Sequence, residues 1–182
     1  MKIIIAGSGG QGILFMGKML AFAGMLAQKK VTWFPSYGAE MRGGTANCTV
    51  IVSDSMIGSP VVLNPDLLVA MNKISLDRFL PALAKKGLLF YDSSIISEPG
   101  FGRDLRTVPV PAIHIAGALG SVKSANMVML GALLAKTGIL DIKFILEVFA
   151  DPMMSGGSEV NIKSFMEGTA YIENTKSKNP RP

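Results

Sequence analysis

The feature that most constrains the fold is a glycine-rich turn near the N-terminus, Gly7-Ser8-Gly9-Gly10-Gln11-Gly12. It follows the short apolar run KIIIA and precedes the long apolar segment ILFMGKMLAFAGMLAQ, residues 13–28. A short β-rich run bounded by glycine is typical of a buried parallel strand. A segment that is apolar all round is typical of a helix buried on more than one face. The turn therefore predicts the opening strand–turn–helix unit of an α/β fold.

The rest of the chain continues this alternation of strands and helices. The pattern predicts further strands at 31–34, 48–54, 67–71 and 88–94, with a short extended segment at 108–116. It predicts helices at 75–87, 124–138 and 141–150, with Ser75 as the N-cap of the first, a kink at Pro81 and a stop at Gly138.

This order predicts one open, doubly wound, Rossmann-like α/β sheet with helices on both faces. We expect a single domain over residues 1–170. Residues 171–182 are short, polar and end in proline, so we expect them to form a frayed C-terminal tail.

The chain is poor in charge. Charged residues make up 17% of the sequence, against about 25% in ordinary globular domains. A membrane protein is not expected, because the longest apolar stretch is interrupted by Lys18 and falls short of the roughly 20 residues that a spanning helix needs. The N-terminus has no signal-peptide pattern. We therefore expect a cytoplasmic subunit of a hetero-oligomer, whose partners cover much of its surface.

Several functions are disfavoured by what the sequence contains. The net charge is +5, but the Lys and Arg residues are scattered, so nucleic-acid binding is not expected. With Cys48 and His114 as the single cysteine and histidine, the chain cannot supply four thiolates to a zinc or iron–sulfur site. We expect no metal site and no catalytic residues in this chain.

The glycine turn also has the spacing of a dinucleotide-binding fingerprint, in which Gly7, Gly9 and Gly12 would occupy the three glycine positions. The acid that usually follows at the end of the second strand is missing, and the next acid is Glu40. A free-standing NAD(P)- or FAD-binding protein therefore stays open as the alternative, beside a packing turn with no ligand and an anion site for another group.

A second loop is more distinctive than the turn. The segment PSYGAEMRGGTANC mixes directional polar groups with glycine, and it follows the second predicted strand at the carboxyl edge of the sheet, where ligands and partners bind. Arg42 is suited to two-pronged contact with a carboxylate or phosphate. The candidate residues of this loop are Ser36, Tyr37, Glu40, Arg42, Gly43, Gly44, Thr45 and Asn47.

Taken together, GSGGQGI, VTWFPSYGAEMRGGTANCTVIVSD, NPDLLVAMN and SANMVMLGALLAKTG resemble the gamma subunit of 2-oxoacid:ferredoxin oxidoreductases. The resemblance runs over about residues 3 to 150 and is strongest to the 2-oxoglutarate type, with the branched-chain and pyruvate types related. It implies a complex that converts a 2-oxoacid and coenzyme A into an acyl-CoA and carbon dioxide, and that passes two electrons to ferredoxin.

The resemblance also implies a division of labour among alpha, beta, gamma and delta subunits. Thiamine diphosphate, Mg and [4Fe-4S] clusters belong to other subunits, and this chain alone binds none of them and is inactive. Its role would be assembly and a border with the coenzyme A site. The residues that carry this interface or coenzyme A role are Gly7, Gly9, Gly10, Gln11, Gly12, Ser36, Tyr37, Glu40, Arg42, Gly43, Gly44, Thr45 and Asn47. Asn126 also matches a family position, where it is suited to capping backbone donors.

Overall fold

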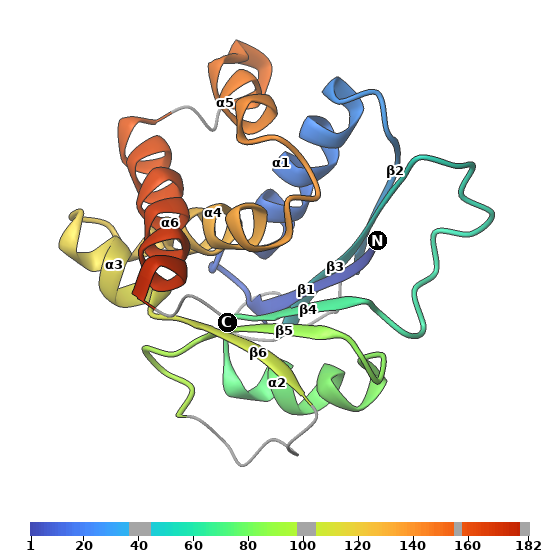
Figure 1. The fold of residues 1–182 in the computed structure, drawn as a ribbon, viewed down its shortest axis with the longest axis horizontal. Helices are drawn as coiled ribbons and strands as arrows, with labels where there is room; N and C mark the ends of the chain where they lie inside the picture. The colour runs from blue at the N-terminus through green and yellow to red at the C-terminus, as the bar shows by residue number, and fades with distance from the viewer. Residues whose placement is uncertain (37–44, 98–104, 155–157, 179–182) are drawn as a thin grey trace.

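The computed structural model describes residues 1–36, 45–97, 105–154 and 158–178. Its first strand lies inside a six-stranded sheet of order β2-β3-β1-β4-β5-β6 (Figure 1). The strands are β1 (Lys2–Ser8), β2 (Lys30–Ser36), β3 (Thr45–Ser53), β4 (Leu67–Ala70), β5 (Leu88–Asp92) and β6 (Arg106–Val110). The helices are α1 (Ile13–Leu26), α2 (Lys73–Phe79), α3 (Ala112–Ala118), α4 (Ala125–Thr137), α5 (Ile142–Ala150) and α6 (Glu159–Lys178), with short 3₁₀ turns η1 (Leu80–Ala82), η2 (Val122–Ser124) and η3 (Pro152–Met154).

The sheet is mixed because β3 runs opposite to its neighbours. β3 pairs antiparallel with both β2 and β1, whereas β1, β4, β5 and β6 form a parallel series. The connection from β2 to β3 comprises residues 37–44, which is shorter than the dozen or more residues that a parallel crossover needs. The two strands must therefore pair antiparallel. As a result, Ser8 pairs with Thr45 and Ser36 pairs with Asn47 where β1 and β2 end and β3 begins.

Helices cover both faces of the sheet, which confirms the predicted fold class. One buried cluster joins α1, α3, α4, α5 and α6 to one face, and a smaller cluster joins α2 and η1 to the other (Figure 1). Alternate residues of β1 divide between the two clusters, with Ile3 and Ile5 in the first and Ile4 and Ala6 in the second. This alternation is expected of a strand buried on both faces.

The predicted helix at 75–87 is wrong in both its start and its length. Helix α2 begins at Lys73, and its N-cap is Asn72, whose Oδ1 accepts the backbone N–H of Ser75 at 2.7 Å. Ser75 is therefore inside the first turn and is not the cap. The helix ends at Phe79 and passes into the 3₁₀ turn η1, which contains Pro81. Proline removes a helical donor, so the α-helix stops there and does not bend.

The extended segment predicted for 108–116 is also wrong beyond Val110. Residues from Ala112 onward form helix α3. The buried carboxylate of Asp92, at the end of β5, accepts the backbone N–H groups of Ala112 and Ile113 at 3.1 and 3.3 Å. A carboxylate that satisfies the first donors of a helix favours its start at that point.

Helix α6 has no counterpart in the predicted elements. It extends to Lys178, so the part of the predicted frayed tail from residue 171 to 178 is helical. The boundary between a domain of residues 1–170 and a tail stays a prediction. The helix is held by close packing on α4: a Cβ added to Gly131 would lie 2.0 Å from the Phe165 carbonyl oxygen, and one added to Gly168 would lie 1.9 Å from the Val128 carbonyl oxygen. Side chains larger than hydrogen cannot occupy these two positions at this helix separation.

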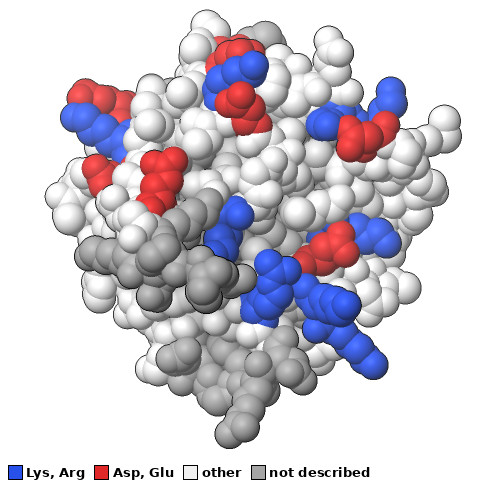
Figure 2. All heavy atoms as spheres, in the orientation of Figure 1, with Lys and Arg blue, Asp and Glu red and all other residues white. Residues whose placement is uncertain are grey.

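The molecular surface reflects the low charge content. On the face drawn in Figure 2, uncharged surface separates small groups of acidic and basic side chains, several of which lie next to each other. The ion pairs among the described residues include Lys73–Asp77 and Lys163–Glu159, which are exposed and one helical turn apart. Such pairs contribute little to stability. The fold therefore depends mainly on its two apolar clusters.

The contact between α4 and α6 leads to a stability prediction. Gly131→Ala and Gly168→Ala should each destabilise the protein by about 2–3 kcal/mol, because the added methyl group meets backbone atoms that cannot rotate away. Helix propensity alone predicts the opposite sign, a gain of roughly 0.5–1 kcal/mol for glycine to alanine. Urea unfolding of the variants and the wild type measures the difference.

Gly117→Ala in α3 is the matched control, since its added Cβ would contact only the Val122 Cγ1 atom at an ordinary 3.6 Å. We expect this variant to be as stable as the wild type or slightly more stable. If Gly131→Ala and Gly168→Ala behave like Gly117→Ala, α4 and α6 are not in backbone contact.

A second prediction concerns the buried thiol of Cys48. Burial raises its pKa from 9.0 to about 12, and the neighbouring Trp33 indole offsets only part of that rise. Because the pKa is higher in the folded state, the thiol favours folding below pH 9, and this contribution is lost as the pH rises toward 12. The free energy of unfolding, taken as wild type minus Cys48→Ala, should fall by roughly 1.4 kcal/mol per pH unit above pH 9. Subtraction removes the titration of groups common to both proteins, and a flat difference would contradict the prediction.

Candidate functional site

The glycine turn connects β1 to α1 in a conformation that requires glycine at two positions. Gly10 has φ +90° and Gly12 has φ +69°, both in the left-handed region. A Cβ on Gly12 would also lie 2.2 Å from the side-chain nitrogen of Asn126. Gly12 is the N-cap of α1, and no side chain caps the backbone donors of that helix. The first N–H groups of α1 are therefore left for a ligand or water.

The Gln11 side chain holds the turn in place through two hydrogen bonds. Its Oε1 accepts the Ser8 backbone N–H at 2.6 Å, and its Nε2 donates to the Met71 carbonyl oxygen at 3.1 Å, just beyond β4. A Cβ on Gly7 would lie 2.6 Å from the same Oε1 atom, so Gly7 makes room for this side chain. Asn72 makes a further hydrogen bond to the turn, in which its Nδ2 donates to the Ser8 hydroxyl at 2.6 Å. The carboxyl ends of β1 and β4 are thus locked together.

Asn126 links the turn to helix α4. Its side chain is buried, its Nδ2 donates to the Gly12 carbonyl oxygen at 3.1 Å, and its Oδ1 accepts the Met127 backbone N–H at 3.0 Å. Asn126 thus accepts from one backbone donor in the first turn of α4, whereas the N-cap position of that helix is Ser124. The bond to Gly12 was not anticipated, because residues 12 and 126 are far apart in sequence and only the fold brings them together.

A first cavity of about 310 Å³ lies between the turn and the β2–β3 edge. It brings the two predicted blocks of site residues together. Its lining comprises Ser8, Gly9, Gly10, Gly12, Ile13, Leu14, Phe15, Ser36, Thr45 and Ala46. The predicted residues Gly9, Gly10, Gly12, Ser36 and Thr45 are thus placed around one cavity.

The other predicted residues are placed differently. Gly7 makes room for the Gln11 side chain, whose hydrogen bonds support the turn. Asn47 lies in β3, paired with Ala6 and Ser36. Tyr37, Glu40, Arg42, Gly43 and Gly44 lie outside the described residues.

Arg78 is a site residue that the sequence did not single out. It comes from α2, on the opposite face of the sheet from α1, and its guanidinium donates to the Thr45 hydroxyl at 3.0 Å. An arginine in a short amphipathic helix has no sequence signal that distinguishes it from an ordinary surface residue. Because Thr45 lines the first cavity, this bond gives that side of the turn a positive charge in addition to the unpaired backbone donors of α1.

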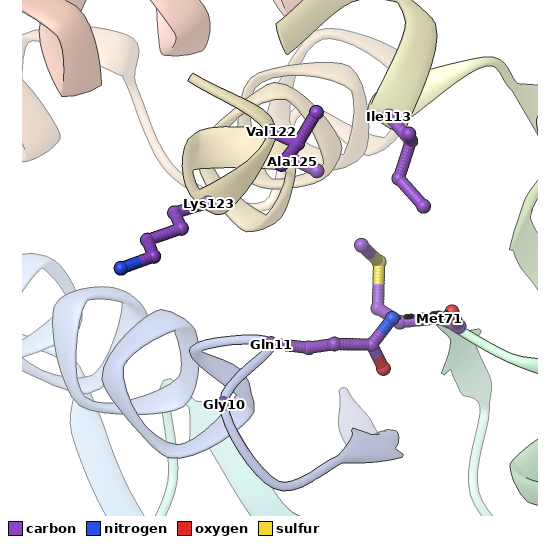
Figure 3. Close-up of a pocket in the computed structure, with 7 residues that line it drawn as sticks. All are labelled: Gly10, Gln11, Met71, Ile113, Val122, Lys123 and Ala125. Atoms are coloured by element: carbon purple, nitrogen blue, oxygen red, sulfur yellow. Dashed lines mark hydrogen bonds between the residues drawn. The ribbon is translucent and has the colours of Figure 1, made fainter. Parts of the chain in front are cut away.

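A second cavity, of about 300 Å³, lies on the other side of the turn. Its lining comprises Gly10, Gln11, Met71, Ile113, Val122, Lys123 and Ala125. Figure 3 shows the Met71 and Ile113 side chains pointing toward each other at one end, while Lys123 extends from η2 toward the side where α1 begins. Gly10 lines both cavities, so the turn is the wall between them.

This position is the point of the sheet where ligands of α/β proteins usually bind. From β1 the chain passes to α1 on one face, whereas from β4 it passes to α2 on the other face. The crevice beyond the carboxyl ends of such neighbouring strands is the switch point of the topology. The second cavity, lined by Gln11 and Met71, lies at this crevice, whereas the first cavity lies on the β3 side of the turn.

The geometry differs from that of a dinucleotide-binding site. In that fold the strand next to β1 is parallel and ends in the acid that binds the ribose. Here the neighbour is β3, which runs antiparallel and begins with Thr45 beside Ser8. The Ser8 N–H, a donor within the turn, is already bonded to Gln11. Among the described residues, therefore, only the glycine half of the fingerprint is present.

The described residues also offer little acid–base or metal chemistry. They contain no cluster of three or more His, Cys, Asp or Glu side chains that could hold a metal ion. The Cys48 thiol is buried and protonated at neutral pH. The described lining of the two cavities is suited to binding anions and apolar groups.

Within the described ranges, none of the helices has the length and apolar character needed to cross a membrane.

Comparison with known proteins identifies relatives along the whole chain. A family model described as pyruvate ferredoxin/flavodoxin oxidoreductase matches residues 2–171. The 2-oxoglutarate synthase subunit KorC of Methanothermobacter thermautotrophicus is 34% identical over 94% of this chain and 94% of its own length. The ketoisovalerate oxidoreductase subunit VorA of the same organism is 45% identical over 74% of this chain, but the match spans only 28% of VorA.

Two solved structures have the same fold. The gamma subunit of a keto/oxoacid ferredoxin oxidoreductase from Geobacter sulfurreducens PCA matches with a TM-score of 0.81 and 28% identity, over 95% of this chain and 98% of that one. A 2-oxoglutarate:ferredoxin oxidoreductase from Magnetococcus marinus, solved with 2-oxoglutarate, coenzyme A and succinyl-CoA bound, matches with a TM-score of 0.87 and 27% identity, over 96% of this chain and 31% of that one. From its sequence and its fold together, the chain belongs to the pyruvate ferredoxin/flavodoxin oxidoreductase family.

Proposed function

We propose that this chain is the gamma subunit of a 2-oxoacid:ferredoxin oxidoreductase. The complex would convert a 2-oxoacid and coenzyme A into an acyl-CoA and carbon dioxide, with two electrons passing to ferredoxin. The observation that carries the proposal is the match to KorC over nearly the full length of both chains. The fold shared with a separate gamma subunit from Geobacter sulfurreducens supports it.

In this proposal the chain acts with cytoplasmic alpha, beta and delta subunits that hold thiamine diphosphate, Mg and the [4Fe-4S] clusters. The single cysteine of the sequence supports placing the clusters elsewhere, because each cluster needs several thiolates. The low charge content supports extensive contact with those partners.

The role of this chain beyond assembly would be to border the coenzyme A site at the glycine-turn edge. The chemistry of that edge fits the phosphate groups of coenzyme A. Unpaired backbone donors at the start of α1, the hydroxyls of Ser36 and Thr45, and the Arg78 guanidinium all favour a phosphate. Bound there, coenzyme A would supply the thiol that accepts the acyl group, while this chain binds and orients it.

The division of labour predicts the activity of separated and assembled subunits. The purified chain should show no turnover of a 2-oxoacid with coenzyme A and a dye acceptor. Co-expression with the alpha, beta and delta chains should give activity, and omission of this chain should abolish it. Turnover by the isolated chain, or full activity of the complex without it, would contradict the proposal.

Arg42 tests the loop that the resemblance singles out. Arg42→Ala should weaken subunit assembly or raise the KM for coenzyme A by about 10- to 100-fold, because a charge-assisted contact contributes about 1.5–3 kcal/mol. Arg42→Lys should recover only part of the loss, since lysine cannot make a two-pronged contact. Arg106→Ala, at the opposite end of the sheet strands, is the control and should behave as wild type.

The 2-oxoacid itself is proposed as 2-oxoglutarate, because KorC, which matches over 94% of its own length, is named for it. Ketoisovalerate is the second candidate, favoured by the higher identity of the shorter match to VorA. We expect the kcat/KM of the assembled complex to be at least about tenfold higher for 2-oxoglutarate, since buried partners for a second carboxylate reject a substrate that lacks it. A preference for ketoisovalerate would reverse this assignment.

A further inference from the structure

We propose that the face of β2 and β3 opposite α1 is a docking surface for a neighbouring subunit, which covers it with an apolar helix flanked by acidic side chains. The inference rests on the proposed function, because it requires a complex. It adds which face of this chain is covered and what kind of surface covers it.

This chain covers β2 and β3 with helices on one side only. Val31 and Trp33 of β2 pack against the larger apolar cluster, which also contains Cys48, Val50 and Val52 of β3. On the other side, helix α2 packs on β1 and β4 (Figure 1). Among the described residues, the smaller cluster includes members of β1, β4 and β5 but none of β2 or β3. Sheets of this architecture have a layer on each face, so this chain lacks part of one layer.

Phe34 is directed toward the uncovered side. Its neighbours in β2 face α1, and side chains alternate between the two faces of a strand. The ring is 55% exposed. Phe34 pairs with Thr49 of β3, whose hydroxyl donates to the Pro60 carbonyl oxygen at 3.5 Å. The connection from β3 to β4, residues 54–66, therefore passes over this face beside Phe34.

This connection adds more apolar side chains to the same surface. Val62 packs against the smaller cluster, and the residues on either side of it are exposed: Val61 by 61% and Leu63 by 76%. Met56 is 91% exposed and lies with Val61 around one hollow of the surface. We call Phe34, Met56, Val61 and Leu63 the β2–β3 patch. None of the four lines either cavity beside the glycine turn. Exposed apolar patches of this kind mark interaction sites.

Exposed lysines lie at two borders of the β2–β3 patch. Lys30 is at the start of β2. Lys85 and Lys86 are placed near the end of the 54–66 connection, because the backbone N–H of Ala84 donates to the Pro65 carbonyl oxygen at 3.0 Å. The ion pairs among the described residues involve none of these three lysines.

The two acids of the 54–66 connection already have partners. Asp54 pairs with Lys29, and the Oδ2 atom of Asp66 accepts the backbone N–H of Lys2 at 2.7 Å. The border of the patch is therefore basic. A two-fold contact between two copies of this face would bring lysines close to lysines, whereas an acidic border on a different chain would complement them. The occupant is therefore a different subunit.

The lengths of two relatives support an occupant of this kind. The match spans 28% of VorA and 31% of the Magnetococcus marinus chain, so most of each of those chains lies outside the matched domain. In such a chain the missing layer can come from the same polypeptide. Here it has to come from a separate subunit.

The experiment uses the co-expressed complex, purified through an affinity tag on the alpha chain. Mass photometry over a dilution series gives the concentration at which half of the complexes have lost this chain. Leu63→Glu and Met56→Glu should each raise that concentration by about 10- to 100-fold, because each would bury a carboxylate without a partner in an apolar contact. Urea unfolding of the isolated variants should match the wild type, since both side chains are exposed.

Ile95→Glu is the matched control. Ile95 is 50% exposed and lies just beyond β5, toward the opposite side of the sheet from β2, so its replacement should leave assembly unchanged. The double variant Lys85→Glu with Lys86→Glu tests the charge. It should weaken assembly at low salt, and its difference from the wild type should shrink between about 0.05 and about 0.5 M salt because ions screen exposed charges. Arginine at both positions should preserve assembly.

Unchanged assembly of both Leu63→Glu and Met56→Glu would overturn the inference. It would also be overturned if the isolated wild-type chain sediments as a dimer that Leu63→Glu converts to monomer, because the occupant would then be a second copy. Neither result affects the gamma-subunit proposal, which is tested separately by omitting this chain from the active complex.

Discussion

The glycine turn keeps its shape because side-chain hydrogen bonds connect it to two other elements, and the candidate site depends on that restraint. Gln11 bonds the turn to the end of β4, and Asn126 bonds it to α4. Positive φ at Gly10 and Gly12 makes the turn accessible only to glycine. A loop that is already fixed in this way does not have to become ordered when a ligand binds. The entropic cost of binding is therefore lower.

The same restraint separates two chemical environments. On the β3 side of the turn lie unpaired backbone donors, two hydroxyls and Arg78, and on the β4 side lies an apolar cavity with one ammonium group. Antiparallel insertion of β3 beside β1 brings Thr45 into the first environment, where a dinucleotide fold would have a parallel strand. The departure from that fold is therefore also the source of the polar groups that distinguish this site.

The sequence predicted the parts of the structure that local pattern controls. The strand–turn–helix unit, the buried character of α1 and the stop of α4 at Gly138 follow from glycine placement and apolar runs. Helix α3 was missed because its start depends on Asp92, a residue from another strand, and α6 was missed because its packing uses glycine where local propensity is poor. For the candidate site, the sequence pointed to the turn and the second loop, and their binding role stays a prediction. Arg78, Asn72 and Lys123 become relevant only through contacts that the fold creates.

A subunit that does not itself carry out the reaction can still contribute to catalysis in a complex. Binding energy from parts of a substrate that do not react can be used to position the part that does. Coenzyme A suits this arrangement, because its adenosine end is remote from its thiol and the two are joined by a long arm. In the proposed complex, the glycine-turn edge would border the coenzyme A site, while the thiol would meet the acyl group on a neighbouring subunit. The low charge content of the chain and its single cysteine are consistent with the proposed role, in which it assembles with subunits that carry out the chemistry.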